Sequence, residues 1–142
     1  MKQELRLSGT GGQGLILAGI ILAEAALLDG KLAIQSQSYG PEARGGSSKS
    51  EVMISEEAIH FPKVTEPNLL LAMSQEAANK YSTDLSPESI LVTDSLFVSK
   101  LPAHTGKIYE LPITHSAKEI LGKALFANII ALGALVKITK IV

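Results

Sequence analysis

Four glycines within six residues separate a short apolar segment from a long one near the start of the chain. Leu5 to Ser8 predicts a short buried strand, and the alanine-rich run from Leu15 to Leu28 predicts a helix. Asp29-Gly30 ends that helix, with Gly30 as its C-terminal cap, and Leu32 to Ile34 predicts a second strand. A strand, a glycine turn, a helix and a strand together indicate a βαβ unit with parallel strands and a right-handed crossover.

The rest of the chain predicts further strands and helices in alternation. Ser50 to Ser55 alternates as a strand, and no helix precedes it, so we expect it to run antiparallel to the second strand. Leu69 to Ala72 is a continuous apolar strand buried on both faces, followed by a helix over Gln75 to Tyr81 that Ser74 caps. Later elements are predicted as strands at 90–92 and 107–111 and helical segments at 116–122 and 123–137.

The predicted fold class is therefore α/β, a three-layer structure around a mostly parallel sheet. It has a Rossmann-like βαβ start and an antiparallel strand insertion after the second strand. We expect residues 1–142 to form a single domain. The apolar end at Ile141-Val142 predicts either a further C-terminal element or a partner chain that covers it.

Composition excludes several classes of function. Thirteen basic and fourteen acidic residues leave a net charge of −1, which provides no basic surface for nucleic acid or an anionic membrane. The chain has no cysteine, so it holds no disulfide, thiolate nucleophile or cysteine-ligated iron–sulfur cluster. The Leu15 to Leu28 run is interrupted by Glu24 and is shorter than the ~20 apolar residues of a membrane helix. A cytoplasmic location is the expectation.

The glycine turn matches the G-x-G-x-x-G pattern through Gly9, Gly11 and Gly14. Its place between a strand and a helix is where backbone N–H groups and a helix amino end can bind a phosphate. A dinucleotide site also needs an acidic residue near the end of the second strand, where this chain has 35-QSQS-38. No Gly-Lys-Ser/Thr follows, so a P-loop is excluded. Three interpretations stay open: NAD(P) or FAD binding, a tight turn for close packing, and a surface facing a phosphate-bearing ligand or a partner chain.

A second loop is expected between the second and third strands, with the sequence SYGPEARGG from Ser38 to Gly46. Pro41 restricts its own φ and biases Gly40 towards extended backbone, while Gly45 and Gly46 allow another surface to approach closely. The Arg44 guanidinium is suited to two-pronged contact with a phosphate or carboxylate. The alternative is a solvated ion pair of Arg44 with Glu42, worth ~0 to 1 kcal/mol.

Candidate catalytic residues are lacking. His60, His104 and His115 show no metal-ligand spacing, and no G-x-S-x-G elbow or acid–base pair of carboxylates is present. Asn128 lies in a predicted apolar helix and must form a hydrogen bond if it is buried, for which capping of a neighbouring loop is the favoured role.

Taken together, the two motifs resemble the gamma subunit of 2-oxoacid:ferredoxin oxidoreductases, the family of pyruvate, 2-oxoglutarate and 2-oxoisovalerate enzymes. The resemblance extends through 67-PNLLLAM-73 and 128–133, and so covers nearly the whole chain. Three features depart from the family pattern: Asn68 in place of a more frequent Asp, a less polar and glycine-poor 91–97 segment, and a shorter chain.

The resemblance implies a function for the chain within a larger enzyme. Such enzymes convert a 2-oxoacid, coenzyme A and oxidised ferredoxin into acyl-CoA, carbon dioxide and reduced ferredoxin. Thiamine diphosphate, magnesium and iron–sulfur clusters are held by partner alpha, beta and ferredoxin-like delta subunits, and a homodimer of the isolated chain is also open. By this resemblance the chain has no catalytic residue, and its ligand- and interface-facing residues are Gly9, Thr10, Gly11, Gly12, Gln13 and Gly14, with Ser38, Tyr39, Gly40, Pro41, Glu42, Arg44, Gly45 and Gly46.

Overall fold

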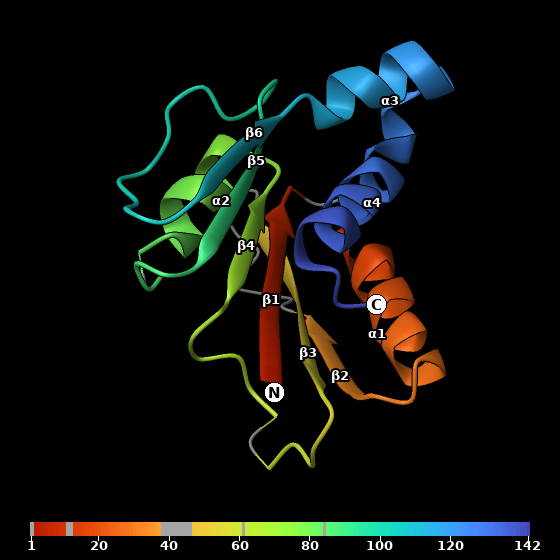
Figure 1. The fold of residues 1–142 in the computed structure, drawn as a ribbon. Helices are drawn as coiled ribbons and strands as arrows, with labels where there is room; N and C mark the ends of the chain where they lie inside the picture. Colours follow the sequence, from red (N-terminus) through yellow and green to blue (C-terminus); the bar gives the residue numbers. More distant parts are fainter. Residues whose placement is uncertain (1, 11–12, 38–46, 61, 84) are drawn as a thin grey trace.

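Within the residues described by the computed structural model, which leaves out 1, 11–12, 38–46, 61 and 84, six strands form one sheet (Figure 1). The strands, in the spatial order β2-β3-β1-β4-β5-β6, are β2 (Leu32–Gln37), β3 (Ser48–Ser55), β1 (Lys2–Gly9), β4 (Leu69–Ala72), β5 (Ile90–Asp94) and β6 (Ile108–Leu111). The helices are α1 (Leu15–Leu28), α2 (Gln75–Tyr81), α3 (Ile113–Leu121), the 3₁₀ turn η2 (Ala124–Phe126) and α4 (Ala127–Thr139).

The sheet is mostly parallel, as predicted. Strands β1, β4, β5 and β6 run parallel, whereas β3 is antiparallel to both β1 and β2. Strands β1 and β2 therefore run in the same direction without being neighbours, because β3 lies between them along the whole of β1. The βαβ start is thus a split one, and the predicted antiparallel insertion occupies its centre.

The predicted elements agree with the structure most closely where a local signal ends them. Helices α1 and α2 and strand β4 have the predicted bounds, Gly30 has a positive φ of 81° after α1, and Ser74 Oγ accepts a hydrogen bond from Ala77 N. Helix α3 begins at Ile113, earlier than predicted. The Asp94 carboxylate, at the end of β5, accepts hydrogen bonds from the Thr114 backbone N–H and hydroxyl and so caps α3 from a distant position in the sequence.

The sheet separates two helical layers of unequal size. Helices α1 and α4 cover one face, α2 covers part of the other, and α3 lies beyond the upper end of the sheet in Figure 1. Alternate residues of β1, such as Leu5 and Leu7, belong to the large core under α1 and α4, and Ile141 packs into this core as well. On the α2 face, Leu70 and Leu91 pack against α2. None of the described helices is both long and apolar enough to cross a membrane.

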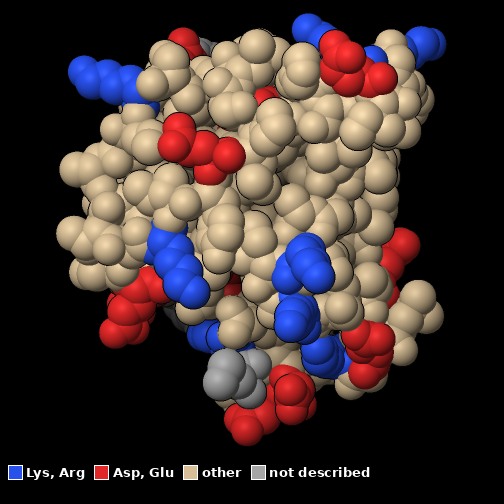
Figure 2. All heavy atoms as spheres, turned by 45° about the horizontal axis from the view of Figure 1, so that its top comes forward, with Lys and Arg blue, Asp and Glu red and all other residues tan. Residues whose placement is uncertain are grey.

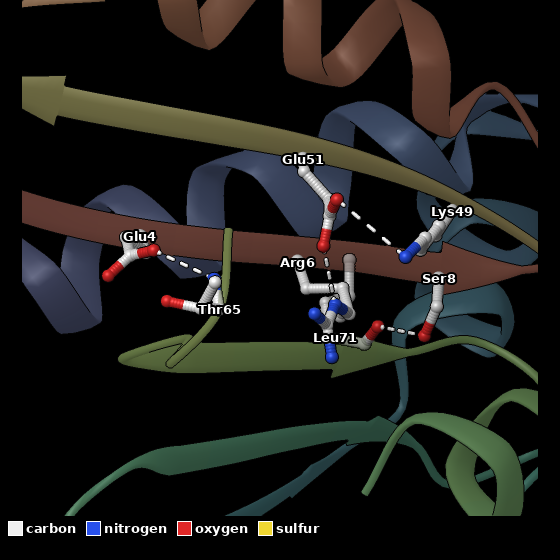
Figure 3. A network of polar contacts seen from close by, with 7 residues as sticks. All are labelled: Glu4, Arg6, Ser8, Lys49, Glu51, Thr65 and Leu71. Carbon is white, nitrogen blue, oxygen red and sulfur yellow. Dashed lines mark hydrogen bonds and ion pairs between the residues drawn. The ribbon is translucent and has the colours of Figure 1, made fainter. Parts of the chain in front are cut away.

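The α2 face of β1 carries a buried polar network (Figure 3). Arg6 Nε donates to Glu51 Oε2 at 2.7 Å, with both side chains at most 9% exposed, and Lys49 Nζ lies 3.7 Å from the other carboxylate oxygen. Nearer the start of β1, Glu4 Oε1 accepts from Thr65 N at 3.2 Å. The Glu4 backbone N–H donates to Asn68 Oδ1, so the asparagine that departs from the family pattern orders the entry to β4. These bonds hold β1 to β3 and to the 65–68 segment.

The Arg6–Glu51 pair yields a stability prediction. Among the described residues, Arg6→Met leaves the buried Glu51 carboxylate with Lys49 as its ion-pair partner, and it is expected to lower the free energy of unfolding by about 3 kcal/mol. Adding Glu51→Met removes the buried charge and is expected to recover at least ~1 kcal/mol of that loss. Urea denaturation of the chain measures both. Lys63→Met, at an exposed cation, is the control, and equal losses in Arg6→Met and Lys63→Met would contradict the role of the pair.

Candidate ligand-facing and interface site

The glycine turn lies at the carboxyl edge of the parallel strands. It follows Gly9 at the end of β1, and the Met73 backbone N–H donates to the Ser8 carbonyl at 2.8 Å, which brings the end of β4 beside it. In open α/β sheets this edge is where ligands bind. Figure 2, with the top of Figure 1 turned forward, shows charged side chains scattered around broad uncharged areas.

Gln13 fastens the turn to the end of β4. Its Oε1 accepts from the Thr10 backbone N–H at 2.8 Å, and its Nε2 donates to the Met73 carbonyl at 3.1 Å. The side chain crosses directly over Gly9, where a Cβ would lie 2.0 Å from Gln13 Oε1 and 3.0 Å from Met73 Cβ. Gly9 therefore leaves room for the glutamine, and one of the turn's backbone donors is already used within the chain.

Gly14 begins α1 in a left-handed conformation, with φ 75° and ψ 21°. A Cβ at this position would approach Asn128 Nδ2 to 2.6 Å. Asn128, only 7% exposed, donates from Nδ2 to the Gly14 carbonyl at 3.2 Å, and the same carbonyl accepts from Ala18 N. This confirms the expectation that a buried Asn128 bonds a neighbouring loop.

Strand β3, which follows the second predicted loop along the chain, begins next to the glycine turn. In the register of β1 and β3, Gly9 lies opposite Ser48, the residue at which β3 begins. The structure thus brings the start of β3 beside the turn that holds the predicted residues Gly9, Thr10, Gln13 and Gly14. The other predicted residues lie outside the described part of the chain: Gly11, Gly12, Ser38, Tyr39, Gly40, Pro41, Glu42, Arg44, Gly45 and Gly46.

The strand order of this sheet differs from the one that a dinucleotide site requires. A ribose-binding acid would stand at the end of a second strand adjacent to the first. Here β3 separates β2 from β1, and the β2 residue Gln35 uses its Nε2 on Gln37 Oε1 and Ser50 Oγ. A cofactor bound at the glycine turn would meet β3 where the ribose-binding strand should be.

Asp94 was not among the residues singled out from the sequence. Its side chain is fully buried at the carboxyl end of β5, where it accepts from Leu96 N as well as from Thr114. The sequence held a signal for it, because an acid lies two residues after the apolar run 90–92 of the predicted strand. Its donors Leu96 and Thr114 follow β5 and lie in α3, respectively, so Asp94 orders the β5 end and α3.

The histidines and acids do not assemble into a metal centre in the described part of the chain, where no group of three or more potential metal-ligating side chains is found. His60 and His115 are exposed, while His104 Nε2 lies 2.8 Å from the Ser89 carbonyl. His104 therefore bonds the residue that precedes β5, at the edge of the sheet opposite to the glycine turn.

Crowding of Gly14 by Asn128 predicts a measurable difference between two glycines. Gly14→Ala adds a clash with Asn128 to the cost of a left-handed backbone, whereas Gly30, with φ 81°, has nothing within 4 Å of its Cβ position. Gly30→Ala is expected to cost about 1 kcal/mol of unfolding free energy and Gly14→Ala about 3 kcal/mol. Asn128→Ala in the Gly14→Ala background should remove the two shortest contacts, those with Nδ2 and Cγ, and so recover part of the loss. Equal costs for the two glycine substitutions in urea denaturation would disprove the crowding.

The comparisons with known proteins agree on one family. The family model for pyruvate ferredoxin/flavodoxin oxidoreductase matches residues 4–142. A 2-oxoglutarate synthase subunit KorC from Methanocaldococcus jannaschii is 51% identical over 100% of this chain and 78% of its own length. Its counterpart from Methanothermobacter thermautotrophicus is 44% identical over 100% of this chain and 79% of its own length.

Solved structures are similar over the same extent. The gamma subunit of a keto/oxoacid ferredoxin oxidoreductase from Geobacter sulfurreducens is 50% identical, with a TM-score of 0.92 over 100% of this chain and 78% of that one. A 2-oxoglutarate:ferredoxin oxidoreductase from Magnetococcus marinus, solved with 2-oxoglutarate, coenzyme A and succinyl-CoA bound, is 25% identical, with a TM-score of 0.87 over 99% of this chain and 25% of that one. The chain therefore belongs to the pyruvate ferredoxin/flavodoxin oxidoreductase family and is homologous to the gamma subunits of its multi-subunit 2-oxoacid:ferredoxin oxidoreductases.

Proposed function

We propose that the chain serves a 2-oxoglutarate:ferredoxin oxidoreductase, in which its glycine turn and its 38–46 loop face coenzyme A and the partner subunits. The substrate assignment is supported by relatives named 2-oxoglutarate synthase subunits at 43–51% identity, against 31–36% for those named as ketoisovalerate or pyruvate enzymes. The reaction would convert 2-oxoglutarate and coenzyme A into succinyl-CoA and carbon dioxide, with two electrons passing to ferredoxin.

The redox and carbanion chemistry would belong to other subunits. Thiamine diphosphate with magnesium supplies the electron sink for decarboxylation, and iron–sulfur clusters carry the electrons. The residues of this chain do not fit either group: the sequence has no cysteine, and its described acids and histidines form no metal-binding cluster. We propose alpha, beta and ferredoxin-like delta subunits as the holders of these cofactors.

The carboxyl edge of β1 is the observation that carries the proposal. Helix α1 begins there, and its first turn has no acidic residue of its own to offset the positive end of its dipole. Coenzyme A brings phosphate groups that such an end attracts, and the cation Arg44 lies four residues before Ser48 in the sequence, and Ser48 is opposite Gly9. Exposed apolar side chains at the same end of the molecule, among them Leu96, Phe97 and Phe126, would be covered by a partner subunit.

Arg44 provides the direct test of this proposal. In the assembled enzyme, Arg44→Ala is expected to raise KM for coenzyme A about tenfold, because a charge-assisted contact is lost, and to leave KM for 2-oxoglutarate unchanged. Arg44→Lys keeps the charge without the planar fork and should lie between the two. Lys107→Ala, at the amino end of β6 on the opposite edge of the sheet, is the matched control. Steady-state kinetics at varied coenzyme A concentration measures KM for each of these variants.

Two results would count against the proposal. One is an unchanged KM for coenzyme A in Arg44→Ala together with a fully active complex, which would favour a pure scaffold role. The other is binding of NADH or FAD to the lone chain in calorimetry, which would favour the dinucleotide alternative; we expect no heat of binding.

A further inference from the structure

Asn128 is a polar residue on an otherwise apolar helix face. The other buried residues of α4 are Ala127, Ala131 and Leu135, and they belong to the core under α1 and α4. Burying an amide among them costs free energy unless both of its ends are hydrogen-bonded. The position therefore calls for a function that an apolar residue could not provide.

Both ends of the Asn128 amide are in use. Oδ1 accepts from the Ile129 backbone N–H at 2.9 Å, one of the first-turn donors of α4 that the helix itself cannot satisfy. Nδ2 donates to the Gly14 carbonyl at 3.2 Å. Turning the amide over would set oxygen against oxygen at Gly14 and hydrogen against hydrogen at Ile129, so only one orientation is satisfied. The side chain is thus a directional bridge from the start of α4 to the start of α1.

The bridge acts on Gly14, a residue whose backbone is conformationally permissive. Glycine populates many backbone conformations, and the left-handed one at Gly14 must be selected by its surroundings. Asn128 occupies the space that a Cβ of residue 14 would need, and its hydrogen bond fixes the direction of the Gly14 carbonyl. Gln13, the preceding residue, is bonded to the Met73 carbonyl. The glycine turn is consequently held from two sides, by α4 and by the end of β4.

We infer that Asn128 is a positioning residue for the enzyme reaction: by fixing Gly14 it sets the orientation in which the glycine turn and the amino end of α1 meet coenzyme A. This inference rests on the proposed function, since it takes the turn to be ligand-facing. Asn128 itself is covered by its own chain and acts through Gly14.

The experiment uses the holoenzyme assembled from all its subunits, with Asn128→Ala and Asn128→Asp. The first removes the bridge, and the second keeps the side-chain shape but opposes a carboxylate to the Gly14 carbonyl. We expect KM for coenzyme A to rise about fivefold in Asn128→Ala and further in Asn128→Asp, with KM for 2-oxoglutarate within about twofold of the unchanged enzyme. Because it keeps the side-chain shape, Asn128→Asp carries the test if Asn128→Ala does not assemble.

A matched control separates positioning from general loosening of α4. Ala131→Gly destabilises the same helix one turn further on and leaves Asn128 in place. It should not change the ratio of the two KM values. A rise in KM for coenzyme A in Ala131→Gly equal to that in Asn128→Ala, or an unchanged KM in both Asn128 variants, overturns the inference.

The same kinetic series separates failure of this inference from failure of the proposed function. Gln13→Ala and Arg44→Ala alter the turn and the loop without touching Asn128. If they raise KM for coenzyme A and the Asn128 variants do not, only the positioning inference fails. If none of these variants changes KM for coenzyme A, the coenzyme A-facing function fails with it.

Discussion

Strand β3 pairs antiparallel with β1 along the whole length of β1 and so decides which segments of the chain become neighbours. The pairing runs from Lys2 opposite Ser55 to Gly9 opposite Ser48. Because the pairing ends at Gly9, the chain that precedes β3 rejoins the sheet beside the glycine turn. The same pairing sets Arg6 opposite Glu51 and keeps β2 away from β1, so one register accounts for the buried ion pair, the position of Ser48 beside Gly9 and the absence of a dinucleotide-site strand order.

The sequence predicted best the elements that local residues delimit. Helix α1 has the expected bounds because a glycine turn precedes it and Asp29-Gly30 ends it, and Ser74 marks the start of α2 in the same way. The start of α3 was missed because its cap, Asp94, is remote in the sequence. The insertion of β3 between β1 and β2 was likewise beyond local reasoning, since an antiparallel strand after β2 can pair on either side of it.

For the candidate site too, the sequence predicted what local residues determine and missed what depends on distant contacts. That Asn128 would bond a loop followed from its polarity in an apolar helix, but the identity of the loop depended on how α4 crosses α1. The glycine pattern correctly marked a strand–turn–helix junction. Packing within the chain already explains two of its glycines, because Gly9 makes room for the Gln13 side chain and Gly14 for that of Asn128. A phosphate-binding pattern and a packing requirement thus coincide at the same residues, which spacing alone could not separate.

A subunit can influence the rate of an enzyme without supplying a catalytic group, by setting the surface against which a substrate is held. In the proposed function this surface is the carboxyl edge of β1, with the turn at 9–14 and the loop at 38–46. Amide hydrogen exchange of this chain, compared among the free chain, the assembled enzyme and the enzyme with coenzyme A, measures whether that surface is covered. We expect assembly to slow exchange in both segments and coenzyme A to slow it further. Unchanged exchange there, with protection confined to other segments, would show the proposed function to be wrong.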